Sequence, residues 1–245
     1  MSGGIERAGV LAAGEGSRLR GAAVPKPLVR VGGRPLIEWT LRGLARAGAR
    51  RIDCIVNERL REVERFLLEG EFGAEVRVLV RTTESSLFSL LALRGRLEEG
   101  PFLLSTTDTI LPLRDWEGFG GAASAIQDRA GEPPGLDALL GVTAFVEDEN
   151  PLWVEVSGEG LAVSLGAGAE GGGLVTSGVY AFHPSVFADA ETVAKNPGAR
   201  LRHLLVRMAD AGRRVGAYRF HRTVDVDRPE DVQTADRLLQ GEGWE

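Results

Sequence analysis

The stretch RAGVLAAGEGSRL (residues 7–19) decides the fold, because it joins an apolar run to a loop of small residues. Its first part, residues 7–13, has the pattern of a buried β-strand. The loop that follows contains Gly14 and Gly16, and glycine lets the backbone adopt positive φ and approach a ligand closely. A buried strand that ends in such a loop is typical of an α/β sheet with a binding site at the carboxyl ends of its strands.

Strand-like and helix-like patterns alternate after this loop. The strand patterns cover residues 51–57, 74–81 and 101–111, and the helix patterns cover residues 35–48, 58–70 and 85–100, where the last helix begins at a serine cap. This repeated order predicts a mostly parallel sheet with helices on both faces.

The pattern changes after about residue 135, where short strands are separated by glycine turns. Residues 151–168 suit a β-hairpin, and further strands are expected at 136–146, 174–184 and 214–220. Helical patterning returns at residues 184–194 and 199–212, and a terminal helix is expected to begin near Pro229. We therefore predict one α/β domain over residues 1–245, with a mixed, mostly parallel sheet and a hairpin-bearing second half.

Composition excludes several classes of function. The formal charge of −6 and pI near 5.3 argue against a nucleic-acid-binding surface, which needs clustered Lys and Arg. The N-terminus lacks the features of a signal peptide and no apolar run could span a membrane, so a cytoplasmic protein is expected. Cys54 is the single cysteine and the three histidines are scattered, which disfavours disulfides and zinc sites.

The glycine loop and a lysine that follows it suggest an anion site. Backbone amides near Gly14, Gly16 and Ser17 could cradle a phosphate, and Arg18 adds a planar charged fork. Lys26 is one of only two lysines among 29 basic residues, and it lies between two prolines that favour extended backbone. An ordinary tight turn is the alternative. The dinucleotide fingerprint fits poorly because its third glycine is replaced by Leu19, and the Gly-Lys-Ser/Thr ending of a P-loop is absent.

These residues resemble a known family. The segment LAAGEGSRLRGAAVPKPLVRVGGRPLIEWTL (residues 11–41) is similar to the N-terminal signature of sugar-phosphate nucleotidylyltransferases. The resemblance continues in LLSTTDTIL (103–111), TSGVYAFHP (176–184) and VDVDRPEDVQTAD (224–236), so it covers nearly the whole chain. It implies a Rossmann-like, GT-A-like nucleotidyltransferase fold, in which about residues 1–135 bind the nucleotide and about residues 136–245 bind the acceptor and supply the C-terminal helix.

The resemblance also implies roles for individual residues. Arg18, Lys26 and Asp108 would be catalytic, and Asp108 together with Asp225 or Asp227 would hold Mg²⁺, with Asp225 preferred. As alternatives, Asp108 could form an Asx-turn and Asp227 could cap the terminal helix. The nucleotide-binding segment implied by the resemblance comprises Leu11, Ala12, Ala13, Gly14, Gly16, Ser17, Arg18 and Lys26.

The substrates are less sharply indicated. Thr83, Ser85, Ser86 and Ser89 lie where relatives contact the base, although a serine cap with solvent-facing neighbours is the alternative. Their segment departs from the P-G-T-A-like loop of many relatives and is closer to cytidylyltransferases, which favours CTP. For the acceptor, the candidates are Ser177, Gly178, Tyr180, Arg200 and Arg202; a solvated basic helix face and a core tyrosine are the alternatives.

The expected function is Mg²⁺-dependent transfer of a nucleotidyl group from a nucleoside triphosphate to a sugar 1-phosphate or small phosphorylated alcohol, with release of pyrophosphate. The expected partners are these two substrates, without nucleic acid or membrane, and a homo-oligomer stays open. Two rivals are a GT-A-like glycosyltransferase and a non-catalytic nucleotide-sensing domain. The first is disfavoured because STTDT (residues 105–109) lacks the acidic pair of a D-x-D motif. The second is disfavoured because binding alone does not require the carboxylates.

Overall fold

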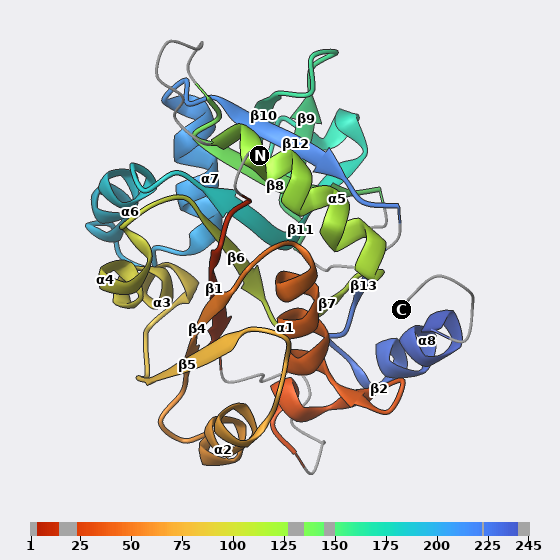
Figure 1. Ribbon diagram of the computed structural model, residues 1–245. Coiled ribbons are helices and arrows are strands. Elements are labelled where there is room, and N and C mark those ends of the chain that lie inside the picture. Colours follow the sequence, from red (N-terminus) through yellow and green to blue (C-terminus); the bar gives the residue numbers. More distant parts are fainter. Residues whose placement is uncertain (1–3, 15–23, 127–134, 145–149, 222, 240–245) are drawn as a thin grey trace.

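The structure, a computed structural model, describes residues 4–14, 24–126, 135–144, 150–221 and 223–239. A nine-stranded sheet lies at its centre and contains strands from both halves of the chain (Figure 1). The first half contributes the strands β1 (Arg7–Ala12), β4 (Arg51–Val56), β5 (Glu75–Val80) and β6 (Phe102–Thr106). These strands run parallel in the order β6-β1-β4-β5. The chain leaves β1 for β4 on one side and later returns to β6 on the other, so strand order reverses at β1.

The second half extends the sheet beyond β6 with strands of mixed direction. They are β8 (Ala138–Thr143), β9 (Trp153–Val156), β10 (Ala162–Leu165), β11 (Leu174–Phe182) and β12 (Val215–Arg219). β11 pairs antiparallel with β6, β8 and β9, while β12 lies parallel to β8. β9 and β10 form the predicted antiparallel hairpin. The mixed, mostly parallel sheet expected from the sequence is confirmed.

Helices cover both faces of this sheet (Figure 1). They are α1 (Leu36–Arg46), α2 (Arg61–Glu69) and α5 (Leu113–Ala123) on one face, and α3 (Ser86–Ala92), α4 (Arg94–Leu97), α6 (Val186–Ala194) and α7 (Leu201–Asp210) on the other. Alternation along β1 explains the two layers, because successive side chains of a strand point to opposite faces. Val10 packs in the apolar cluster under α1 and α5, whereas Leu11 packs in the cluster under α3 and α7.

A smaller apolar cluster fixes the C-terminal helix α8 (Pro229–Leu239). Val226 and Ala235 pack there with Trp39. Two short antiparallel pairs frame the cluster, and they join β2 (Arg30–Val31) to β3 (Arg34–Pro35) and β7 (Thr109–Ile110) to β13 (Val224–Asp225). The end of the chain is thereby held against the segment that follows the first loop.

Three local features differ from the sequence-based expectations. The helix expected over residues 85–100 is divided, because the turn tightens at Leu93 and Gly95 weakens the helix that follows. Helix α5 and the short 3₁₀ turns η3 (Ser124–Ile126) and η4 (Glu170–Gly172) were not expected. Lys26 begins a 3₁₀ turn, η2 (Lys26–Leu28), instead of lying in extended backbone, because the Leu28 N–H donates to the carbonyl of Pro25 at 2.8 Å.

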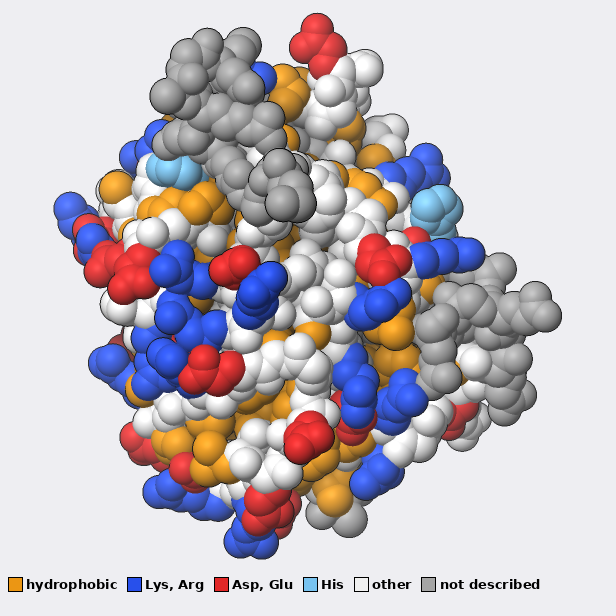
Figure 2. Space-filling model, viewed as in Figure 1, with side chains coloured by type: hydrophobic (Ala, Val, Ile, Leu, Met, Phe, Trp, Pro, Cys, Tyr) orange, Lys and Arg blue, Asp and Glu red, His pale blue; other side chains and the backbone are white. Residues whose placement is uncertain are grey.

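The described part of the chain contains no helix with the length and apolarity needed to cross a bilayer. On the face shown in Figure 2, acidic and basic side chains are interspersed.

Candidate active site

The larger of two adjoining cavities opens at the carboxyl ends of the parallel strands. Its volume is about 690 Å³, and the segments that follow β1, β4, β5 and β6 all contribute to its wall. This place is expected for a ligand in an open α/β sheet, because strand order reverses there. The wall is formed by Leu11, Ala12, Ala13, Gly14, Lys26, Pro27, Asn57, Thr82, Thr83, Glu84, Ser85, Ser86, Ser89, Thr106, Thr107, Asp108 and Arg200.

A smaller cavity of about 190 Å³ continues from the first one. Ser86, Thr106 and Asp108 belong to both walls, so the two spaces meet at these side chains. The remaining wall comes mainly from β11, the start of α7 and β13, with Leu152 beside them. A molecule in each cavity would therefore face the other across Asp108.

Lys26 lies where the cavities meet and contacts two carboxylates. Its Nζ donates to Oδ1 of Asp227 at 2.5 Å and to Oδ2 of Asp108 at 3.3 Å. Only 12% of the Lys26 side chain is exposed, whereas 38% of Asp108 and 29% of Asp227 is exposed. The lysine therefore lies beneath two acids that still face the cavity.

These contacts keep both kinds of group charged. Burial opposes the charge of Lys26, but Asp108 and Asp227 outweigh it and raise the pKa of Lys26. Burial likewise opposes the charge of Asp108, but Lys26 and a hydrogen bond from Thr106 together lower the pKa of Asp108. The site thus presents an ammonium beside ionised carboxylate at neutral pH.

Asp225 reaches the same place through the pairing of β13 with β7. Asp225 lies opposite Thr109 in this pair, and the Val226 N–H donates to the carbonyl of Asp108 at 2.9 Å. The Thr109 hydroxyl lies 2.6 Å from Oδ1 of Asp225 and 2.6 Å from the carbonyl of Ser177. Asp108, Asp225 and Asp227 all line the smaller cavity.

The beginning of α8 is capped by Asp231. Its Oδ2 accepts hydrogen bonds from the N–H groups of Asp227 at 2.9 Å and Arg228 at 2.7 Å. Such a carboxylate satisfies backbone donors that have no partner within the helix. The Asp227 side chain accepts a hydrogen bond from Lys26.

The donor set at this edge fits magnesium. Mg²⁺ prefers hard oxygen ligands, and it is commonly bound by one or two carboxylates, with substrate phosphates and water completing its shell. Asp108 and either later aspartate supply such carboxylates. Within the described ranges, no cluster of three or more His, Cys, Asp or Glu side chains could enclose an ion alone. A magnesium ion held by one or two of these carboxylates would have coordination positions left for a phosphorylated substrate.

The predicted nucleotide-binding residues fall into two groups. Gly16, Ser17 and Arg18 lie outside the described residues. All the others line the larger cavity, namely Leu11, Ala12, Ala13, Gly14, Lys26, Thr83, Ser85, Ser86 and Ser89.

Ser85 occupies the cap position of α3 without making the expected side-chain cap, because its hydroxyl donates to the carbonyl of Ala199 at 2.5 Å. The Thr83 and Ser89 hydroxyls bond to each other at 2.6 Å.

The predicted acceptor residues are also divided. Ser177, Gly178, Tyr180 and Arg202 line the smaller cavity, whereas Arg200 lines the larger one. Gly178 has φ +79°, and a Cβ there would meet the Thr106 hydroxyl at 2.3 Å, so this position requires glycine.

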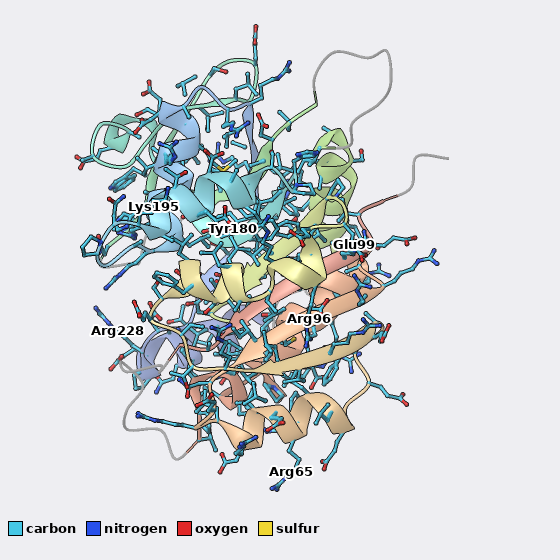
Figure 3. The ribbon with its side chains drawn as sticks, turned by 90° about the vertical axis from the view of Figure 1, so that its left-hand side faces the viewer. Arg65, Arg96, Glu99, Tyr180, Lys195 and Arg228 are labelled. Atoms are coloured by element: carbon cyan, nitrogen blue, oxygen red, sulfur yellow. The ribbon has the colours of Figure 1, made fainter. Side chains whose placement is uncertain are left out.

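Tyr180, which is labelled in Figure 3, is buried. Burial and the nearby charges of Asp108 and Asp225 raise its pKa to about 12, although a hydrogen bond with Thr176 and the charge of Arg202 act in the opposite direction. The phenol is therefore neutral at physiological pH. It offers the smaller cavity a polar group without a charge.

Sequence reasoning missed Asn57, which is 2% exposed and lines the larger cavity. Its Nδ2 donates to the carbonyl of Ala13 at 3.2 Å, and its Oδ1 accepts from Thr82 Oγ1 at 3.2 Å and Arg59 N at 3.0 Å. Asn57 thus ties the ends of β1 and β5 together. The sequence feature that could have pointed to Asn57 is its position as the first polar residue after the buried strand β4.

Fold and site together define the class of protein. A cavity at the switch point of an α/β sheet, with a buried lysine and carboxylates beside a second small cavity, is the arrangement expected of a nucleotidyltransferase. Comparison with known proteins supports this class directly, because residues 8–118 match the model of the MobA-like NTP transferase domain.

Individual relatives agree with the family match. The chain is 28% identical over 239 residues to the bifunctional IPC transferase and DIPP synthase of Aquifex aeolicus, covering 96% of this chain and 52% of that protein. It is 40% identical over 104 residues to the CMP-5'-(3-aminopropyl)phosphonate synthase of Streptomyces rubellomurinus, covering 40% of this chain and 16% of that protein. The chain thus spans about half the length, or less, of these relatives.

A solved structure shows the same fold. The inositol-1-phosphate CTP transferase from T. maritima superimposes with a TM-score of 0.80 at 23% identity, covering 98% of this chain and 99% of that one. The family match over residues 8–118 and the likeness of fold therefore agree with the resemblance that the motifs indicated.

Proposed function

We propose that this chain catalyses Mg²⁺-dependent transfer of a cytidylyl group from CTP to a small phosphorylated polyol or alcohol, with release of pyrophosphate. The observation that carries the proposal is the meeting of the two cavities at Asp108, beside Lys26. A triphosphate in the larger cavity would place its α-phosphate next to an acceptor phosphate in the smaller one. Because both reactants are anionic, positioning and charge neutralisation are the main requirements.

The reaction needs no protein nucleophile. An oxygen of the acceptor phosphate attacks the α-phosphorus, the bond from that phosphorus to the bridging β-phosphate oxygen breaks, and pyrophosphate leaves. Lys26 would lie near the reacting phosphates and offset their charge. Asp108 with Asp225 or Asp227 would hold Mg²⁺, which supplies charge neutralisation at phosphate oxygens when bound. Arg18, in the motif that resembles the family signature, would add a second cation.

The remaining residues would bind and orient the substrates. In the larger cavity, Gly14 and its neighbours would approach the triphosphate, and the pair formed by Thr83 and Ser89 would lie near the base. In the smaller cavity, Arg202 would attract the acceptor phosphate, while Gly178 and Tyr180 would face the rest of the acceptor. We propose that both cavities belong to one domain over residues 1–245.

CTP is preferred for two reasons. The segment over residues 81–90 is closer to cytidylyltransferases than to the P-G-T-A-like loop of other relatives. In addition, a relative that is 40% identical over 104 residues is named as the synthase of a CMP conjugate. The name of the T. maritima protein suggests inositol 1-phosphate as the first acceptor to examine. A cytoplasmic location is part of the same proposal.

A pyrophosphate-release assay tests this function. The purified chain is incubated with Mg²⁺, one of the four nucleoside triphosphates and one of a panel of phosphorylated sugars, polyols and amino alcohols, and each product is identified by mass spectrometry. We expect release that requires CTP, an acceptor and the metal. Pyrophosphate release with another triphosphate in place of CTP would overturn only the choice of the base.

The same assay separates the rivals. A glycosyltransferase would consume an activated sugar without forming pyrophosphate, and a sensing domain would bind the nucleotide without turnover. Absence of pyrophosphate for every pair, with nucleotide binding intact in calorimetry, would overturn the proposed activity.

A further inference from the structure

Two serines at the start of α3 bond to the backbone on both sides of Arg200. The Ser85 hydroxyl donates to the carbonyl of Ala199 at 2.5 Å. The Ser86 hydroxyl oxygen accepts from the Leu201 N–H at 3.2 Å. Residues more than 110 positions apart are thereby joined, one pair from each half of the chain.

These bonds fix the point at which α7 begins. The first N–H groups of a helix lack acceptors within the helix, and Ser86 provides one for Leu201. The intervening residue is also held, because the Arg200 N–H donates to Nδ1 of His203 at 3.1 Å. Backbone groups of three successive residues, 199–201, therefore have defined partners.

The beginning of α7 carries the two arginines that face the cavities. Arg200 lines the larger cavity and Arg202 the smaller one, while Ser86 lines both. The Arg202 guanidinium donates to the carbonyl of Asn150 at 2.5 Å, and a guanidinium has five N–H donors, so this contact leaves donors for a phosphate. The directions of both arginines depend on the helix start that Ser85 and Ser86 hold.

The donor hydrogen of the Ser85 hydroxyl is not available for recognising a base. A hydroxyl has one donor hydrogen, and that of Ser85 is used by Ala199. A base contact that needed this donor would break the bond to α7. The Thr83 and Ser89 hydroxyls lie within the nucleotide half, where they bond to each other and Thr83 also donates to the carbonyl of Ser85.

We propose that Ser85 and Ser86 are positioning residues for the acceptor site, which act by holding the start of α7 and with it Arg200 and Arg202. This inference rests on the proposed function of the same site. It assigns the two hydroxyls to acceptor binding, although they line the wall of the nucleotide cavity. Loss of either hydroxyl would loosen the arginines without removing a group that touches the nucleotide base.

Steady-state kinetics with both substrates test this assignment. In Ser85→Ala and Ser86→Ala we expect the KM for the acceptor to rise by roughly three- to tenfold, as the loss of one hydrogen bond implies, while the KM for the triphosphate, whose cavity Arg200 also lines, rises by a smaller factor. Ser86→Thr keeps the hydroxyl and should restore the acceptor KM. Ser89→Ala, one turn along the same helix, is the matched control and should alter the KM for the triphosphate instead.

A rise in the triphosphate KM alone, or unchanged values for both substrates, would overturn the assignment. If circular dichroism shows that Ser86→Ala does not fold, the KM values of Ser85→Ala and Ser86→Thr are compared with those of the wild type instead.

Calorimetry with inorganic phosphate separates this inference from the proposed function. The larger cavity is first filled with a non-hydrolysable CTP analogue, and phosphate is then titrated into wild type and Ser86→Ala. Weaker phosphate binding by the variant supports the role of the serine even if no acceptor yields turnover. Equal phosphate binding overturns it, whatever the activity of the wild type.

Discussion

Lys26 and Asp227 form an ion pair across 201 positions of sequence, with 2.5 Å between Nζ and Oδ1. The same Nζ lies 3.3 Å from Oδ2 of Asp108, so one ammonium contacts two carboxylates and offsets part of the repulsion between them. A divalent cation bound to these acids would compete with the lysine for the same oxygens. We therefore expect Lys26 to turn toward the substrate phosphates when metal and nucleotide bind.

Replacing Lys26 tests this expectation. Lys26→Met should lower turnover by about 100-fold, because a cation near the reacting phosphates is lost. It should also strengthen the binding of Mn²⁺ in the absence of nucleotide, measured by electron paramagnetic resonance, because the two acids lose their competing partner. Lys195→Met, at the other lysine, is the control, since Lys195 is exposed (Figure 3). Weaker Mn²⁺ binding by Lys26→Met would contradict this account.

Asp108 should be essential for turnover but not for folding. Asp108→Asn keeps the shape of the side chain and removes its charge, so we expect turnover to fall by at least about 100-fold. The melting temperature should change little, because 38% of the side chain is exposed. Turnover comes from the pyrophosphate assay and stability from thermal denaturation followed by circular dichroism. Wild-type turnover in this variant would remove Asp108 from the metal site.

Asp225 and Asp227 can be distinguished by comparison. We expect Asp225→Asn to raise the Mg²⁺ concentration needed for half-maximal turnover by about 10-fold or more. Asp227→Asn should raise this concentration by a smaller factor. The reason is that the Lys26 ammonium forms an ion pair with the Asp227 carboxylate, whereas Asp225 accepts a hydrogen bond from the neutral hydroxyl of Thr109. The measurement is a Mg²⁺ titration of the initial rate for each variant. The opposite order would assign the second ligand to Asp227.

Asn57 should hold the nucleotide cavity in shape. Asn57→Ala removes the bonds to Ala13, Thr82 and Arg59, so we expect the free energy of unfolding to fall by about 1–3 kcal/mol. The KM for the triphosphate should rise, because the loop after β1 loses its tie to β5. Urea denaturation and kinetics measure the two effects, with exposed Asn196→Ala as control. A stable variant with an unchanged KM would leave Asn57 without this role.

Stability at high pH should depend on Tyr180. Its pKa is raised to about 12 in the folded protein, against about 10 in an unfolded chain. The folded state therefore favours the neutral phenol. The contribution of Tyr180 to the free energy of unfolding is fully present below pH 10 and is lost as the pH rises from 10 to 12. The loss is on the order of 2 kcal/mol. Urea denaturation from pH 10 to 12 should show that the free energy of unfolding falls less steeply with pH for Tyr180→Phe than for the wild type. An equally steep fall in both proteins would contradict the role given to Tyr180.

Much of the fold and part of the site could be predicted from local patterns. The apolar run before Gly14, the alternation through residue 111 and the glycine turn between β9 and β10 report on local structure, which depends on neighbouring residues. The motifs around Lys26 and Asp108 indicated the resemblance to nucleotidylyltransferases for the same reason. The polar bonds of Asn57 were missed because they depend on how distant segments pack. The break at Leu93 was missed although its cause is local, since Gly95 weakens the helix there.

The sequence by itself determined the class of sheet, the resemblance to nucleotidylyltransferases and the candidate side chains, because strand periodicity and short motifs are properties of contiguous residues. The tertiary structure alone decided that Lys26 lies between Asp108 and Asp227, that Thr109 meets Asp225, and that two serines hold the start of α7. These contacts join segments between 82 and 201 positions apart. Their geometry follows from packing of the sheet and helices, which no local pattern records.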